Sequence, residues 1–200
     1  MAPRPSAPAT PRNGWDSSRC AGSTYCTRCP RFVDREGVAV LVEHYQPDDR
    51  EALVALYEDL DAYSRTLGVP PTTHEDVVDW LDHLTADGWN VVARLDGRIV
   101  GHIAVVPADA AEPEFVVFVH QDYQGRGIGT ELLKQAIARA AAAGYDALRL
   151  TVAAENDAAR SVFEGLGFEV IERLEWECQM RLSCGDPIAS QVRRPPADRR

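Results

Sequence analysis

The chain has 200 residues, of which 45% are hydrophobic and 26% charged, and this composition is ordinary for one soluble globular domain with loose sequence at its ends. Its formal net charge of -10 argues against a general nucleic-acid binder, which would carry a basic face. Because no apolar run approaches the roughly 18 residues that span a bilayer, and the N-terminus lacks a charged-then-apolar signal, we expect a cytoplasmic protein with no membrane partner.

The two ends of the chain differ in composition from its middle. Residues 1–36 are rich in proline, glycine and serine and lack periodic hydrophobic residues, which predicts a disordered N-terminal extension. Residues 183–200 combine prolines with arginines, which predicts a flexible C-terminal tail. We therefore expect one folded domain over residues 37–182.

Five cysteines raise the question of a metal site. Cys26 and Cys29 have the C-x-x-C spacing of zinc ligands, and Cys20 or the distant pair Cys178 and Cys184 could add a ligand. The partner C-x-x-C that would make a zinc ribbon is missing from the sequence. We therefore favour reduced cytosolic thiols and expect no metal.

The first half of the expected domain begins with a strand and two helices. The β-branched run at 38–42 predicts the strand. A helix opens at 47–49, where a proline and two aspartates precede apolar residues that recur at three- and four-residue spacing. Thr72 or Thr73 can cap the second helix, which repeats that spacing.

A hairpin and a buried strand follow. The β-rich runs 89–95 and 98–106 flank Asp96 and Gly97, the dipeptide that accepts the positive φ angles of a type I′ turn. The continuous apolar run 115–119 predicts a strand buried on both faces.

The second half alternates helices with strands. In order, these are helix 127–143 ended by Gly144, strand 147–153, a short helix capped by Asn156 or Asp157, and strands 168–171 and 174–182. The complete order is β-α-α-β-β-β-α-β-α-β-β. It predicts an α/β fold of the α+β type, a mixed central β-sheet flanked by helices on both faces.

A glycine-rich turn, residues 124–130, lies between the buried strand and the long helix. Its alternating glycines Gly125, Gly127 and Gly129 leave the backbone N–H groups unobstructed, and the helix start adds free donors and the positive end of the dipole. Such a turn suits a phosphate or diphosphate. The spacing differs from a Rossmann fingerprint and lacks the Gly-Lys-Ser/Thr ending of a Walker A loop. The remaining alternative is a tight turn without a ligand.

Two segments resemble the signature of the GNAT superfamily of N-acetyltransferases. Residues 117–129 read VFVHQDYQGRGIG, in which Gln124, Gly127 and Gly129 fill the pattern Gln/Arg-x-x-Gly-x-Gly/Ala. Residues 156–168 read NDAARSVFEGLGF and resemble the second characteristic segment. The likeness covers about residues 38–182 and implies the GNAT acyl-CoA acyltransferase fold.

The resemblance also implies a binding mode for acetyl-CoA. Backbone groups of Val117 and Val119 pair with the pantetheine arm like an added strand, residues 125–130 cradle the diphosphate, and the Asn156 side chain contacts the arm. Asn156 could equally serve as a plain helix cap, and the two roles can coexist. The implied cofactor-binding residues are Val117, Phe118, Val119, Gln124, Gly125, Arg126, Gly127, Ile128, Gly129, Thr130, Asn156 and Phe163.

The sequence departs from the family pattern at the proton donor. The family uses a tyrosine for the thiolate proton at the position of Phe163, which has no proton to give. Water or another hydroxyl therefore protonates the thiolate, or the protein binds acyl-CoA without efficient transfer. As the base, we single out Glu114 at the entrance to the strand 115–119. The alternates are Glu112, His102 and His120, and His102 fits a hydrogen-bonded packing residue better than a base.

The resulting prediction is an N-acetyltransferase that moves an acetyl group from acetyl-CoA to a primary amine on a small molecule, a peptide N-terminus or a lysine. The alternative is a non-catalytic acyl-CoA sensor, which the phenylalanine at 163 motivates. Tyr57, Tyr63 and Trp80 lie on or beside the first two helices, which shape the acceptor pocket in this family. We expect no nucleic-acid partner and leave a homodimer open.

Overall fold

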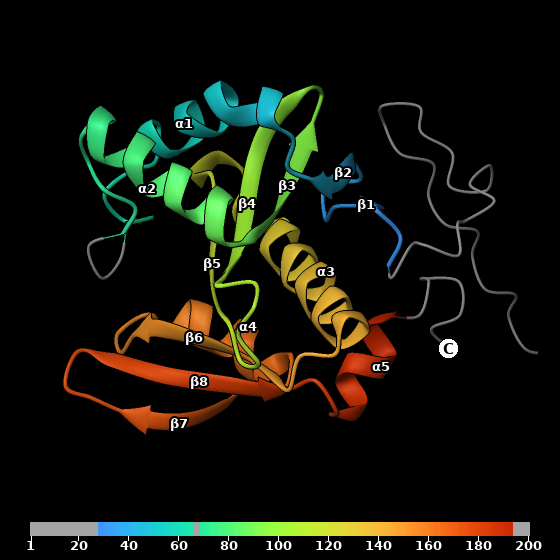
Figure 1. Ribbon diagram of the computed structural model, residues 1–200. Helices are drawn as coiled ribbons and strands as arrows, with labels where there is room; N and C mark the ends of the chain where they lie inside the picture. The colour runs from blue at the N-terminus through green and yellow to red at the C-terminus, as the bar shows by residue number, and fades with distance from the viewer. Residues whose placement is uncertain (1–27, 66–68, 194–200) are drawn as a thin grey trace, which may run out of the picture.

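The computed structural model describes residues 28–65 and 69–193. It has one eight-stranded sheet in the order β1-β2-β3-β4-β5-β6-β8-β7 (Figure 1). The strands are β1 (Arg31–Val33), β2 (Ala39–His44), β3 (Trp89–Leu95), β4 (Arg98–Val106), β5 (Glu114–Val119), β6 (Ala147–Ala153), β7 (Glu169–Arg173) and β8 (Glu177–Ser183). The helices are α1 (Arg50–Glu58), α2 (His74–Asp87), α3 (Ile128–Ala143), α4 (Asp157–Gly165) and α5 (Pro187–Arg193).

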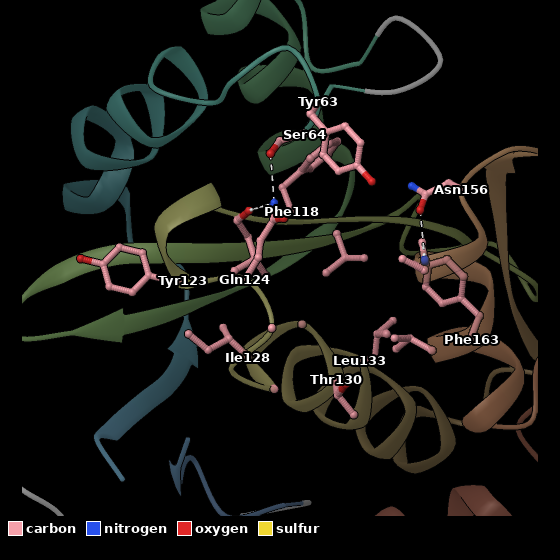
Figure 2. A pocket seen from close by; sticks show the side chains of 18 of the residues that line it. Tyr63, Ser64, Phe118, Tyr123, Gln124, Ile128, Thr130, Leu133, Asn156 and Phe163 are labelled. Atoms are coloured by element: carbon pink, nitrogen blue, oxygen red, sulfur yellow. Dashed lines mark hydrogen bonds between the residues drawn. The ribbon is translucent and has the colours of Figure 1, made fainter. Parts of the chain in front are cut away.

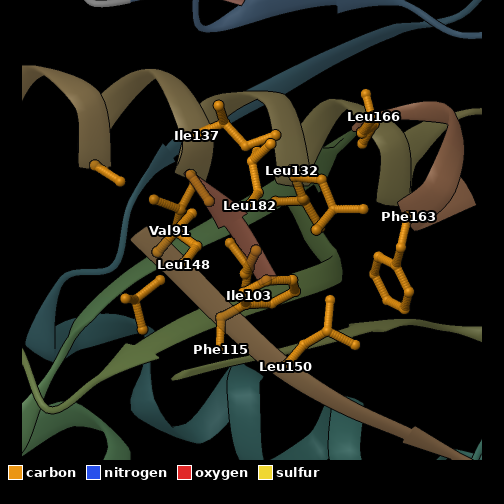
Figure 3. Close-up of a cluster of buried hydrophobic side chains, with 14 of the residues drawn as sticks. Val91, Ile103, Phe115, Leu132, Ile137, Leu148, Leu150, Phe163, Leu166 and Leu182 are labelled. Atoms are coloured by element: carbon orange, nitrogen blue, oxygen red, sulfur yellow. The ribbon is translucent and has the colours of Figure 1, made fainter. Parts of the chain in front are cut away.

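Helices cover both faces of this sheet, which confirms the predicted fold class. On one face α1 and α2 bury Leu53 and Leu81 against residues of β3 and β4. On the other face α3 buries Leu132 and Ile137, and α4 adds Phe163, in the larger of the two hydrophobic clusters (Figure 3). Among the described residues, no helix has both the length and the apolar character needed to cross a membrane.

Local signals in the sequence locate most element boundaries correctly. The Thr73 side chain caps α2 by accepting a hydrogen bond from the backbone N–H of Asp76. Asp96 and Gly97 have φ angles of 48° and 83°, as the β3–β4 hairpin turn requires. Gly144 ends α3 in the left-handed conformation with φ 84°.

The folded domain extends beyond both expected boundaries. Strand β1 lies within the expected N-terminal extension and pairs with β2. Helix α5 lies within the expected C-terminal tail and buries Ala189 and Val192 against the larger cluster. Both elements are short and form through tertiary contacts, so local periodicity did not reveal them. The expected tails over residues 1–27 and 194–200 lie outside the described residues.

The sheet splits between β5 and β6, the only parallel neighbours among the described strands. These strands are in register only at Glu114 and Arg149, where the Arg149 N–H donates to the Pro113 carbonyl at 3.0 Å. Beyond that point β5 stays paired with β4 alone, and β6 turns away with β8 (Figure 1). The prediction that 115–119 is buried on both faces is therefore wrong after Phe115, because the residues that follow border the split and are only half-buried.

The metal question is answered for part of the chain only. The described residues contain no group of three or more His, Cys, Asp or Glu side chains that could hold a metal ion. Cys178 is a buried free thiol, while Cys29 and Cys184 are partly buried. Cys20 and Cys26 lie outside the described residues, so the C-x-x-C pair has no structural description.

Candidate active site

A pocket of about 330 Å³ occupies the split and extends to the start of α3. Its walls come from β5, the glycine turn, the first turns of α3 and α4, and the segment after α1 (Figure 2). The structure brings together all the predicted cofactor-binding residues except Arg126. Those that line the pocket are Val117, Phe118, Val119, Gln124, Gly125, Gly127, Ile128, Gly129, Thr130, Asn156 and Phe163.

The backbone of β5 presents hydrogen-bonding groups to this pocket. In an antiparallel pair, residues whose backbone groups bond to the partner strand alternate with residues whose groups face away. The His120 N–H donates to the Val100 carbonyl at 3.0 Å, so the groups of Phe118, two residues earlier, also face β4. The groups of Val117 and Val119 therefore face the split, where an extended ligand could pair with them.

Gln124 fixes the end of β5 to the opposite wall. Its Nε2 donates to the Val119 carbonyl at 3.0 Å and to the Ser64 hydroxyl at 2.9 Å (Figure 2). The motif glutamine thus joins the glycine turn, the strand and the segment after α1. Ser64 lines the pocket, and no sequence pattern had pointed to it.

The glycine turn takes the conformation that a phosphate site requires. Gly125 and Gly127 have φ angles of 71° and 91°, which side chains rarely tolerate, and Gly127 is the N-cap of α3. The first N–H groups of a helix have no acceptor within that helix, and here they open at the pocket with the positive end of a 16-residue helix dipole. Gly129 has ordinary helical φ, so the fold itself does not demand glycine there.

The Arg126 side chain points away from the pocket. Its guanidinium forms an ion pair with Asp34, whose side chain is fully buried, and a weaker one with Glu36 at 3.2 Å. It also lies over the Tyr123 ring, 5.2 Å from the centroid. Two carboxylates outside the motif therefore hold this side chain away from the pocket, and a contact between the Arg126 backbone and the diphosphate stays a prediction. Arg35, from the expected disordered extension, lines the pocket instead.

Asn156 caps α4, as one of its two predicted roles requires. Its Oδ1 accepts a hydrogen bond from the Ala159 N–H at 3.0 Å. This leaves its amide nitrogen turned toward the pocket (Figure 2). A contact between that nitrogen and a cofactor stays a prediction.

Phe163 is part of an aromatic cluster at the edge of the pocket. Its ring meets those of Phe115 and Phe168 edge to face, with centroids 6.0 and 5.9 Å away. It provides no proton, so a donor must come from elsewhere. Among the described residues that line the pocket, Tyr63, Ser64, Tyr123 and Thr130 carry hydroxyl groups, and Figure 2 shows the Tyr123 hydroxyl directed away from the pocket.

Glu114 lies at the closed end of the split, outside the main pocket. It accepts a hydrogen bond from the Thr151 hydroxyl at 2.8 Å and borders a neighbouring hollow with Arg149 and Gln179. The alternate Glu112 is engaged by Arg181 at 2.7 Å, and this hydrogen bond holds the pKa of Glu112 below its usual range. A lowered pKa makes Glu112 a weaker base.

The two histidines considered as bases have structural partners. Burial lowers the pKa of His102 to about 3, so its ring is neutral. Burial also raises the pKa of Tyr57. The Tyr57 hydroxyl donates a hydrogen bond to His102 Nδ1 at 2.5 Å. On the other side of the ring, His102 Nε2 donates to Asn90 Oδ1 at 2.9 Å. His120 is buried, with Nε2 2.9 Å from Asp59. His102 is thus the hydrogen-bonded packing residue that the sequence predicted.

A mixed sheet split beside a glycine turn at a helix start defines the class of acyl-CoA-dependent acyltransferases. The family model described as "Acetyltransferase (GNAT) family" matches residues 48–168. The chain belongs to this family. It is an N-acetyltransferase, as its sequence predicted.

Known proteins show how far the likeness extends. L-amino acid N-acetyltransferase AaaT of Escherichia coli (strain K12) is 28% identical over 140 residues, which are 66% of this chain and 83% of that protein. Mycothiol acetyltransferase of Nocardia farcinica is 33% identical over 149 residues, but these are only 46% of its length against 74% of this chain.

Solved structures agree on the fold. The GNAT domain of S. lividans PAT has a TM-score of 0.67 at 23% identity, covering 76% of this chain and 95% of that domain. The putative acetyltransferase yncA from Salmonella typhimurium, solved with acetyl-CoA, has a TM-score of 0.60 at 19% identity, covering 74% and 95% of the two chains.

Proposed function

We propose that this chain acetylates the primary amine of a small molecule, and that the acceptor is an α-amino acid or a close analogue. The observation that carries the reaction is the split beside β5, where a glycine turn meets backbone groups that do not bond to β4 in one pocket. The acceptor class is supported by relatives alone. One relative, of whose length this chain covers 83%, is named for L-amino acids. Another relative is named for methionine sulfoximine and methionine sulfone.

The pantetheine arm of acetyl-CoA would lie along β5 as an added strand. The backbone groups of Val117 and Val119 that face the split support this placement, since they can pair with the amides of the arm. The diphosphate would bind at Gly127 and the start of α3. The thioester carbonyl would then lie near the β5 backbone, where N–H groups stabilise the negative charge that develops on its oxygen.

The transfer needs one group to accept a proton and one to donate it. The neutral amine attacks the thioester carbon, the C–S bond breaks, and the sulfur leaves as a thiolate. Glu114 is the proposed base for the proton that the amine loses, at the closed end of the split. Tyr63 is the proposed donor for the thiolate, because its hydroxyl points across the pocket in the direction of Asn156 (Figure 2).

The direct test measures CoA thiol release with L-amino acids, polyamines and N-terminal peptides as acceptors. We expect turnover with one or more amino acids and little with polyamines or peptides. Turnover only with peptides or polyamines would contradict the acceptor class. Binding of acetyl-CoA with no turnover on any amine would favour the sensor alternative.

Variants separate the two proton carriers. Glu114→Gln and Tyr63→Phe should each lower kcat by about 10²-fold or more, the usual scale of general acid–base help. Glu169→Gln, at an exposed acid on β7 that does not line the pocket, is the matched control. If Glu114→Gln keeps the rate and pH profile of the wild type, Glu114 is not the base. In the same way, Tyr63 is not the proton donor if Tyr63→Phe keeps the rate and pH profile of the wild type.

A further inference from the structure

The segment 34–37, which precedes the region that the family model matches, lies against the glycine turn. The backbone N–H of Arg35 donates to the Arg126 carbonyl at 3.1 Å. The Arg35 side chain donates from Nη1 to the Gly125 carbonyl at 3.0 Å. A residue 90 positions away in sequence is therefore attached to two successive residues of the turn by both its backbone and its side chain.

Asp34 stabilises this contact through hydrogen bonds and an ion pair. Its carboxylate accepts hydrogen bonds from the N–H groups of Glu36 at 3.0 Å and Val38 at 2.8 Å, which closes a tight loop around Gly37. The same buried carboxylate binds the Arg126 guanidinium. One aspartate thus turns Arg126 away from the pocket and fixes the loop that carries Arg35 toward it.

The Arg35 guanidinium reaches the place where a phosphate would bind. Its Nε lies 3.9 Å from the position that a Cβ would occupy on Gly127, the N-cap of α3. Of the described residues that line the pocket, Arg35 is the one with a charged side chain. The Gly125 carbonyl engages Nη1, and a guanidinium has further N–H groups on its other nitrogens.

We propose that Arg35 is a ligand for the diphosphate of the acyl-CoA substrate, supplied to the site by the N-terminal segment. This inference rests on the proposed function of the pocket. The helix start offers N–H groups and a partial charge, and a guanidinium adds a full charge with paired donors that match phosphate oxygens. In a chain with a formal net charge of -10, this local cation offsets repulsion of a polyanionic substrate. Arg35 acts in binding and not in the chemical step.

The test measures the Kd of three ligands by calorimetry: acetyl-CoA, acetyl-dephospho-CoA, which lacks the 3′-phosphate, and acetyl-pantetheine, which lacks every phosphate. The full chain is compared with Arg35→Gln, which keeps a neutral donor for Gly125, and with Arg35→Lys. Arg173→Gln, an exposed arginine on the edge strand β7, is the control for the loss of one charge. Thermal unfolding verifies that each variant is folded.

We expect Arg35→Gln to raise the Kd of acetyl-CoA and of acetyl-dephospho-CoA by about 10- to 100-fold, as the loss of a hydrogen bond between charged groups predicts. Arg35→Lys should fall between the wild type and Arg35→Gln, and the Kd of acetyl-pantetheine should not change.

Three outcomes would overturn the proposal. Equal Kd values for the wild type and Arg35→Gln would show that Arg35 does not contact the diphosphate. If Arg35→Gln weakens the binding of acetyl-CoA alone, Arg35 contacts the 3′-phosphate and not the diphosphate. If it weakens the binding of acetyl-pantetheine equally, the role of Arg35 is purely structural. Failure of the wild type to bind acetyl-CoA would contradict the function of the pocket and the assignment of Arg35 with it, whereas wild-type binding that is unchanged in Arg35→Gln would contradict the assignment alone.

Discussion

At the scale of single residues, Phe163 is where this chain differs most from its family pattern. Phe163 is 6% exposed and lines the pocket, so we expect a hydroxyl at the para position of its ring to face a thioester bound there. We expect Phe163→Tyr to raise the kcat of the Tyr63→Phe variant by about 10-fold or more, because it supplies a general acid where the proposed one is missing. The measurement is the rate of CoA release at saturating acetyl-CoA, with a thermal unfolding curve to verify that the fold is unchanged. A folded double variant that is no faster than Tyr63→Phe would contradict this prediction, because it would mean that the new hydroxyl does not protonate the thiolate.

His102 makes stability depend on pH. The unfolded chain binds a proton on this ring below its ordinary pKa of 6.5, whereas the folded chain does so only near pH 3. Stability is therefore lost as the pH falls from about 6.5 toward 3, by up to about 5 kcal/mol.

Urea unfolding at several pH values measures this loss. His102→Gln can keep both hydrogen bonds, to Tyr57 and Asn90, and should flatten the dependence by about one proton. His74→Gln, at an exposed histidine, should not. Identical slopes in the wild type and His102→Gln would contradict the assignment.

At the scale of elements, the N- and C-terminal segments are joined to α3 by one buried ion pair. The Arg28 guanidinium binds the Glu131 carboxylate in the first turn of α3, with Nη2 at 2.6 Å, and also donates to the Val192 carbonyl in α5 at 2.9 Å. We expect Arg28→Met to cost about 3 kcal/mol, because it leaves a buried carboxylate without a partner. The double variant Arg28→Met with Glu131→Leu should lose less free energy of unfolding than Arg28→Met alone. Urea unfolding of the two single variants and the double variant measures this coupling, and additive losses would contradict it.

Local signals explain why so many elements were predictable. A capping threonine at 73, the Asp96-Gly97 turn and Gly144 each act within a few residues, so their effect can be read from sequence. Strand β1 and helix α5 have only three and seven residues and form against distant partners. The split between β5 and β6 is likewise a tertiary feature, which explains why β5 appeared fully buried from its apolar run.

The site follows the same division. The glycine turn and Asn156 could be identified from sequence because each lies in a local motif whose own residues supply the hydrogen-bonding groups. Arg35 was not, because its place beside Gly127 depends on a loop that Asp34 closes and on contacts across 90 residues. The role of Ser64 is also a tertiary one, since it meets Gln124 only in the folded chain.

At the scale of the whole molecule, we propose that the acidic chain binds its polyanionic substrate in the pocket at the split. The sheet splits between β5 and β6 (Figure 1). The glycine turn and the β5 backbone border that split, and the proposed base and acid are residues beside it. Binding of acetyl-CoA in the split is therefore the central claim, because every proposed role depends on it.

Calorimetric titration of acetyl-CoA into the full chain tests this claim most directly, beside Gly127→Trp and Gly144→Trp. The two glycines cap opposite ends of α3 with φ angles of 91° and 84°, so both substitutions carry similar backbone strain, but only Gly127 lines the pocket. We predict that the wild type and folded Gly144→Trp bind acetyl-CoA and that folded Gly127→Trp does not. A folded wild type that fails to bind, or a Gly127→Trp variant that binds as well as Gly144→Trp, would contradict the account.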